Sequence, residues 1–169
     1  MSTLDEIEAA IPALRRLARG LVRDRDAADD LVQDCLERAV AKRHLWRRDG
    51  PVLHWLYRIM VNRARDTGRR ARFELVPLDT VAEPIGCAGG QDEHLGLREV
   101  QEALERLVPE QRQALLLVAV EGLSFDEAAS VLGIPRGTLM SRLARARAQL
   151  RVLTGREGPG VTPIGRRKT

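Results

Sequence analysis

Residues 124–151, SFDEAASVLGIPRGTLMSRLARARAQLR, decide the fold of the C-terminal half of this chain. Ser124 followed three residues later by Glu127 is a capping-box pattern, in which each side chain satisfies a backbone N–H at a helix start. Gly133 suits the left-handed residue that ends a helix, and Pro135 suits the beginning of the next one. Two helices joined this closely must cross steeply, so the stretch predicts a helix-turn-helix.

The second of these helices has one apolar face and one basic face. The apolar face, at helical spacing, is formed by Leu139, Leu143, Ala146 and Leu150. The opposite face carries hydroxyl and guanidinium groups that suit phosphates and base edges, namely Arg136, Thr138, Ser141, Arg142 and Arg145. Between Ala128 and Gly155 the chain has five arginines and no Asp or Glu. A solvated face usually mixes charges, so the pattern favours binding to duplex DNA.

Composition and charge divide the chain into regions. Its 169 residues are 44% hydrophobic but only 3% aromatic, which favours helical cores of aliphatic side chains. Residues 73–97 contain five acidic and no basic residues, with several Pro and Gly, and are expected to be a flexible acidic linker. We therefore expect an all-α fold with two small helical domains, over 1–72 and 98–153, each with its own core. A basic, disordered tail is expected over 154–169.

Three helices are predicted in the first domain, over about 7–21, 27–43 and 52–72. The middle one has an acidic outer face, and Asp26 is expected to cap it. Acidic residues there suit either compensation of the helix dipole or docking of a basic protein, and both interpretations stand. The loop before the third helix combines Trp46 with several cations, so Trp46 either stacks on an unpaired base or covers the core. The third helix is basic.

No catalytic or metal-binding motif is found in the sequence. Cys35 and Cys87 lack partners at metal-ligand spacing and are expected to be free thiols, with Cys35 in the core. No cofactor is expected. The N-terminus lacks the apolar segment of a signal peptide and no apolar run approaches the length of a membrane span, so we expect a cytoplasmic protein without membrane insertion.

Three stretches carry a resemblance to a known family. They are DRDAADDLVQDCLERA (24–39), WLYRIMVNRARD (55–66) and LVPEQRQALLLVAVEGLSFDEAASVLGIPRGTLMSRLARARAQLR (107–151). In this order, over residues 8–152, the chain resembles bacterial RNA polymerase sigma factors of the extracytoplasmic-function (ECF) group. One departure is Leu139-Met140, where the family commonly has Val-Lys, so the recognition helix has one cation fewer.

The resemblance implies a role for each region. The first domain corresponds to sigma region 2, which binds core RNA polymerase and opens the −10 element, and the second corresponds to region 4, which reads the −35 duplex. Polymerase-binding residues by this match are Asp30, Leu31, Val32, Gln33 and Asp34. Residues matched to −10 DNA are Arg43, Trp46, Arg47, Arg48, Trp55, Asn62, Arg65, Arg69 and Arg70. Residues matched to −35 DNA are the five polar-face residues of the recognition helix, and the acidic linker would approach the path of nascent RNA.

The partners implied are core RNA polymerase, promoter DNA and an anti-sigma factor. The alternative is a freestanding helix-turn-helix regulator that acts without polymerase. Such a regulator normally dimerises to read two half-sites, and the sequence has no heptad pattern, so no obligate homodimer is expected. An enzyme would need a titratable cluster that the sequence does not contain.

Overall fold

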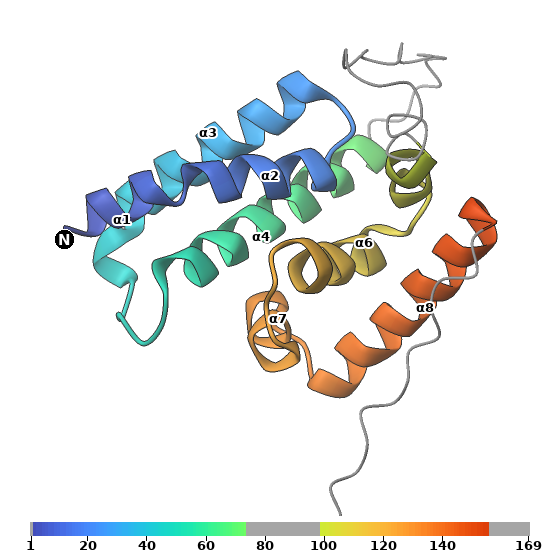
Figure 1. Ribbon diagram of the computed structural model, residues 1–169. Helices are drawn as coiled ribbons and strands as arrows, with labels where there is room; N and C mark the ends of the chain where they lie inside the picture. The colour runs from blue at the N-terminus through green and yellow to red at the C-terminus, as the bar shows by residue number, and fades with distance from the viewer. Residues whose placement is uncertain (1, 74–98, 156–169) are drawn as a thin grey trace, which may run out of the picture.

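The computed structural model describes residues 2–73 and 99–155, and these residues form helices and turns without a strand (Figure 1). The expected all-α fold is therefore confirmed for this part of the chain. The linker carrying Glu74, Asp79, Glu83, Asp92 and Glu93, the residue Cys87, and the basic tail from residue 156 lie outside the described residues.

The N-terminal unit contains α1 (Thr3–Ala9), α2 (Ile11–Leu21), α3 (Arg25–Lys42), the 3₁₀ turn η1 (Arg43–Leu45) and α4 (Val52–Phe73). The first predicted helix is two helices, because Ala10 ends α1 and Pro12 stands in the first turn of α2, where proline is tolerated. Asp24 caps α3 by accepting the Ala27 N–H at 2.9 Å. The prediction that Asp26 is the cap is wrong, since Asp26 is the second residue of α3 and lies within its first turn.

The C-terminal unit contains a helix over 99–105, α6 (Pro109–Leu115), the π-helical turn η2 (Leu116–Val120), α7 (Phe125–Leu132) and α8 (Arg136–Thr154). The capping box is confirmed: the Glu127 N–H donates to Ser124 Oγ at 3.3 Å, and the Ser124 N–H donates to Glu127 Oε2 at 2.8 Å. Gly133 ends α7 in the left-handed conformation, with φ +65°. Pro135 precedes α8, and the helix-turn-helix is as predicted.

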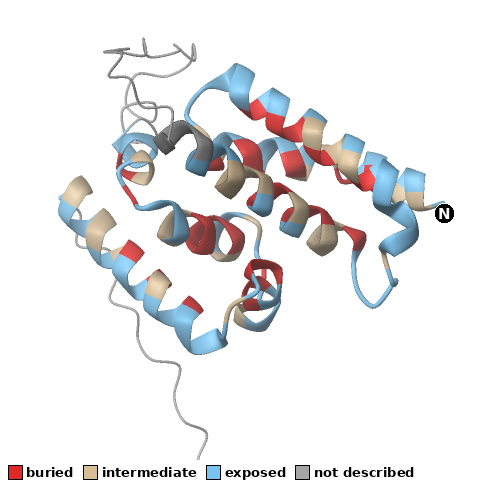
Figure 2. Cartoon of the chain, turned by 180° about the vertical axis from the view of Figure 1, so that it is seen from behind, coloured by how far each residue is buried: buried red, intermediate tan, exposed pale blue. Residues whose placement is uncertain are grey.

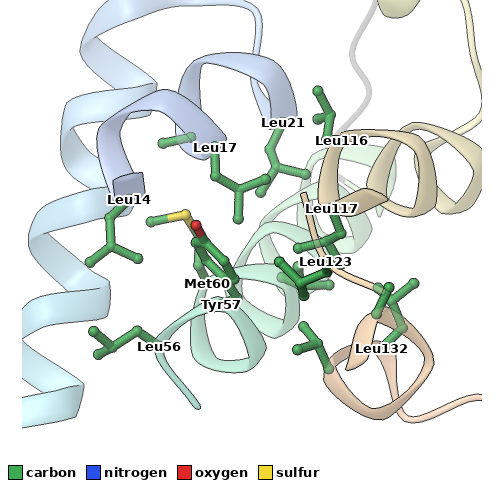
Figure 3. Packing of buried hydrophobic residues seen from close by; sticks show 14 of the residues in the cluster. Leu14, Leu17, Leu21, Leu56, Tyr57, Met60, Leu116, Leu117, Leu123 and Leu132 are labelled. Atoms are coloured by element: carbon green, nitrogen blue, oxygen red, sulfur yellow. The ribbon is translucent and has the colours of Figure 1, made fainter. Parts of the chain in front are cut away.

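Buried side chains of the two units form one continuous cluster rather than two separate cores (Figure 2). Figure 3 shows Leu17 and Leu21 of α2, with Tyr57 and Met60 of α4, facing the side chains of η2 and α7. Gly20 allows the closest approach, since a Cβ there would lie 2.7 Å from Leu116 Cδ2. The expectation of two cores is wrong because the apolar faces of α2 and α4 extend to the C-terminal unit.

The half-buried Arg112 connects the ends of two helices where the two units meet. The Arg112 guanidinium donates to the carbonyls of Leu104 at 2.8 Å and Glu105 at 2.6 Å, in the preceding helix. It also donates to the Leu21 carbonyl at 3.2 Å, at the end of α2. Carbonyls at helix ends lack intrahelical partners, so a buried cation that reaches several of them stabilises the junction.

Cys35 provides a chemical test of the core. Its thiol is fully buried and donates to the Leu56 carbonyl at 3.5 Å, as expected for a core residue. Burial, and then the charge of Asp34, raises the pKa of the thiol to about 12. Because the thiolate is the reactive form, we expect Cys35 in a Cys87→Ser variant to resist thiol reagents at neutral pH and to react fully in denaturant. Rapid labelling of the native variant would contradict this packing.

Candidate nucleic-acid interface

The recognition helix α8 presents the polar face that the sequence predicts. Leu139, Leu143 and Ala146 are buried against α6 and α7, and Leu150 is half-buried. Four of the five candidate −35 residues are exposed, namely Arg136, Thr138, Ser141 and Arg145. The helix therefore offers cations and hydroxyls on a solvent-facing side that has no carboxylate of its own.

Arg136, at the start of α8, is positioned by the preceding helix. Its Nη1 lies 3.0 Å from Asp126 Oδ2, and its guanidinium lies 5.8 Å from the centre of the Phe125 ring. Both charged side chains of this ion pair are exposed, so the pair contributes little to stability. The ion pair holds Arg136 beside α7, at the N-terminal end of the exposed face of α8.

Arg142 differs from the other candidate −35 residues because it is half-buried, whereas the other four are exposed. Its Nη1 is inaccessible to solvent and has no hydrogen-bond partner among the described residues. Burial, followed by the nearby charge of Arg142, lowers the pKa of Arg65. One candidate −35 residue and one candidate −10 residue are therefore near enough for their charges to interact, and both are half-buried.

The loop between α3 and α4 brings two tryptophans together. Trp46 and Trp55 stack with ring centroids 6.4 Å apart and planes inclined by 22°. Arg48 lies 5.7 Å from the centre of the Trp46 ring, and its Nη2 donates to Thr3 Oγ1 at 3.1 Å. Both rings are half-buried against the core. This arrangement fits both sequence interpretations, since the rings cover the core and retain partly exposed edges beside the exposed cations Arg43 and Arg47.

The remaining candidate −10 residues lie along α4 and differ in their surroundings. Asn62 is exposed, and the exposed Arg69 donates to Asp66 Oδ1 at 3.0 Å. Arg65 donates from Nε to the buried Gln113 Oε1 of α6 at 3.0 Å, so it takes part in the junction. The side chain of Arg70 lies outside the described residues.

The candidate polymerase-binding residues on α3 fall into two groups. Asp30 and Gln33 are exposed, whereas Leu31 and Val32 belong to the core and are positioned to support the helix rather than to meet a partner. Asp34 pairs with Arg63 of α4 and with Arg38 one turn away, at 3.3 Å. Burial opposes ionisation of Asp34, but hydrogen bonds from these two guanidiniums outweigh it and lower its pKa.

A polar cluster that the sequence did not suggest joins the two units. Glu121, which follows η2, receives hydrogen bonds from Arg16 of α2 at 2.9 and 2.6 Å and from the Tyr57 hydroxyl of α4. Arg58 of α4 donates to the Ser130 carbonyl of α7 at 2.7 Å. The one available signal was a single acid, Glu121, directly after the apolar run LLLVAV and before glycine. Nothing in that pattern identifies its partners.

Two features are absent from the part of the chain that the structure describes. No group of His, Cys, Asp and Glu side chains there is arranged to hold a metal ion. No described helix combines the length and the apolar character needed to cross a membrane.

Comparison with known proteins agrees with this arrangement. A family model described as the Sigma2 domain of PhyR matches residues 7–61, and one described as Sigma-70, region 4 matches residues 97–150. The ECF RNA polymerase sigma factor EcfG of Rhodopseudomonas palustris is 39% identical over 90% of this chain and 84% of its own length. The chain belongs to the ECF RNA polymerase sigma factors. SigM of Mycobacterium tuberculosis, another ECF sigma factor, is 41% identical over 88% of this chain and 74% of its own length.

A solved relative shows the same fold in a complex. The sigma factor RpoE of Bartonella quintana, bound to the anti-sigma factor NepR, is 33% identical and superposes with a TM-score of 0.74 over 91% of this chain and 97% of its own. The ECF assignment confirms the interpretation of the chain as a sigma factor that directs promoter-specific initiation by core RNA polymerase. The comparisons do not support the alternative of a regulator that acts without polymerase.

Proposed function

We propose that the two units of this ECF sigma factor have different functions. The N-terminal unit binds core RNA polymerase through the exposed acidic side of α3 and separates the −10 strands with the loop before α4. The C-terminal unit reads the −35 duplex with the exposed face of α8. The factor has no catalytic step of its own, because phosphodiester chemistry belongs to the polymerase.

The observation that carries this proposal is the segregation of charge between α3 and α8. The outer side of α3 presents Asp30 and Gln33, and the outer side of α8 presents Arg136 and Arg145 without a neighbouring acid on that helix. Opposite potentials steer a protein to different partners. An acidic side suits a basic protein surface, whereas a basic helix suits the phosphates and base edges of duplex DNA.

An anti-sigma factor is the proposed regulator, because RpoE of Bartonella quintana is solved with the anti-sigma factor NepR. The similarity covers nearly all of both sigma chains, so a protein of that kind would meet the same two-unit surface here. We further propose that the factor works in the cytoplasm, where core polymerase and promoter DNA are found. Co-purification of the chain with a small partner that blocks its binding to polymerase would support this part of the proposal.

The Trp46 side chain gives a test of the −10 assignment. We expect Trp46→Ala to lower promoter opening by the holoenzyme about fivefold, because stacking of one base on an aromatic ring is worth about 1 kcal/mol or more. Permanganate footprinting of unpaired thymines measures the opening. Leu45→Ala is the matched control, since Leu45 is an exposed residue of the same loop.

The same two variants separate the two interpretations of Trp46. If Trp46 only covers the core, its removal lowers the melting temperature and leaves opening unchanged at a temperature where the variant is folded. Equal losses of opening in the Trp46 and Leu45 variants would also contradict a specific role for the aromatic ring.

A further inference from the structure

Met140 is an exposed apolar residue on the side of α8 that faces solvent. Its relative exposure is 46%, whereas the preceding residue, Leu139, is fully buried. Met140 stands in the second turn of α8, and the N-terminal residues of a recognition helix are those that contact base edges in the major groove. Its side chain offers no hydrogen-bond donor. An apolar group therefore occupies a place where a DNA-reading helix would meet a base.

The neighbours of Met140 one turn away on the exposed side are small. Gly137, one turn earlier, has no side chain, and a Cβ there would meet no described atom within 4 Å. Ala144, one turn later, is exposed and carries a single methyl group. Residues three and four apart on a helix share a face, and small ones let the backbone approach a ligand closely. Met140 can thus project into a groove without obstruction from these two residues.

The exposed cations of α8 lie to the side of Met140. Arg136 is held toward α7, since its Nη1 lies 3.0 Å from Asp126 Oδ2 and its guanidinium lies 5.8 Å from the centre of the Phe125 ring. Arg145, five residues after Met140, is about 140° away around the axis of a helix with 3.6 residues per turn. These cations suit phosphates, which carry no sequence information. Met140 is placed to read a base instead.

The chemistry of the major groove narrows the base that Met140 fits. Thymine alone presents an apolar group there, its 5-methyl, whereas guanine and cytosine present polar atoms. An apolar side chain over a polar edge removes water without replacing its hydrogen bond, which is unfavourable. The thioether chain of methionine is flexible and polarisable, so it packs well against a methyl group. Met140 therefore favours a T·A pair and disfavours a G·C pair.

We propose that Met140 is a specificity-determining residue that reads the 5-methyl group of one thymine in the −35 element. The inference rests on the proposed function, in which α8 reads the −35 duplex, and adds the base and the chemical group that one position requires. The exposed cations of α8 attract any duplex, whereas Met140 selects a T·A pair at one position.

The test removes the methyl group from the DNA. In a promoter fragment that the holoenzyme transcribes, deoxyuridine replaces each thymine of the −35 element in turn, on both strands. Fluorescence anisotropy at fixed salt then measures the affinity of the holoenzyme for each fragment. Deoxyuridine pairs as thymine does and lacks only the methyl group. We expect one thymine at which the replacement lowers affinity about threefold to fourfold, the value of one buried methylene-sized group.

Variants at Met140 connect this sensitivity to the side chain. Met140→Leu keeps an apolar group and should keep the sensitivity to deoxyuridine. Met140→Lys should lose it and shift the preference at that position toward guanine, whose N7 and O6 accept hydrogen bonds from lysine. Val152→Ala is the matched control, since Val152 is an apolar residue of the same helix that is 83% exposed and lies near its C-terminal end. This control should respond to deoxyuridine as the unsubstituted protein does.

Three results would overturn the assignment of Met140. They are unchanged affinity with deoxyuridine at every thymine, full sensitivity retained by Met140→Lys at the same thymine, and a −35 element that contains no T·A pair. Failure of the proposed function would look different. The holoenzyme would then transcribe no promoter, or its affinity would not depend on the sequence of the −35 duplex at any position, and the inference would fall together with the function on which it rests.

Discussion

Asp30→Arg is expected to abolish stable association with core RNA polymerase, by about a hundredfold or more in Kd. Asp30 is exposed on the outer side of α3 and stands in the block that the sigma-factor resemblance assigns to polymerase binding. Like charges placed opposite each other at an interface cost several kcal/mol, and a basic polymerase surface would meet a new cation. Pull-down with purified core polymerase measures the effect.

Two controls make this result specific. Glu8→Arg reverses an exposed acid on α1, in the same unit but outside the candidate surface, and should leave association intact. Asp30→Arg should also retain its affinity for duplex DNA. Asp34→Arg would be a poorer test, because Asp34 pairs with Arg63 of α4 and its loss would disturb the packing of two helices. If the Asp30 variant and the unsubstituted protein bind core polymerase with equal affinity, α3 does not form the polymerase interface.

Arg142→Ala is expected to weaken binding to a −35 duplex by about 1–3 kcal/mol, or roughly fivefold to 150-fold. A guanidinium that pairs with a guanine edge or a phosphate accounts for a loss of this size.

Fluorescence anisotropy at fixed salt measures this loss on a duplex from a promoter that the holoenzyme transcribes. Arg151→Ala is the matched control, since Arg151 lies on the same helix, is exposed, and stands outside the candidate reading set. It should lower affinity only slightly and equally for all sequences. A similar, sequence-independent loss in both variants would mean that Arg142 contributes general charge rather than promoter recognition.

Local signals in the sequence predicted the helix-turn-helix well. The Ser124 and Glu127 capping box, the end of α7 at Gly133 and the buried side of α8 each depend on residues within a few positions of one another. Such signals specify a helix regardless of its neighbours. They also supported the family resemblance, which the comparisons confirm.

Long-range packing was not predictable in the same way. Glu121, Arg112 and Gln113 look like ordinary residues of an amphipathic segment, and their partners Arg16, Leu21 and Arg65 are far away in the chain. Periodicity shows which side of a helix is apolar, but it does not show which distant helix covers that side. The continuous core and the contacts of Glu121 therefore appear only in three dimensions.

The burial of individual residues in the candidate site was equally hard to predict from the sequence. Arg142 and Arg145 stand one turn apart on the predicted polar face of α8, yet Arg142 is half-buried and Arg145 is exposed. The surroundings of each side chain decide the difference, and residue type alone does not reveal them. Similarly, the matched block on α3 combines exposed Asp30 with buried Leu31, so a motif identifies a surface helix without identifying each contact.

The most direct test of the central claim is initiation in a reconstituted system. Purified chain and core RNA polymerase are incubated with genomic DNA fragments, and the 5′ ends of the transcripts are sequenced. The account predicts discrete start sites that share a −10 and a −35 element, that depend on the chain, and that disappear with Asp30→Arg. Transcripts that start at the same positions with and without the chain, or no association with core polymerase under any condition, would contradict it.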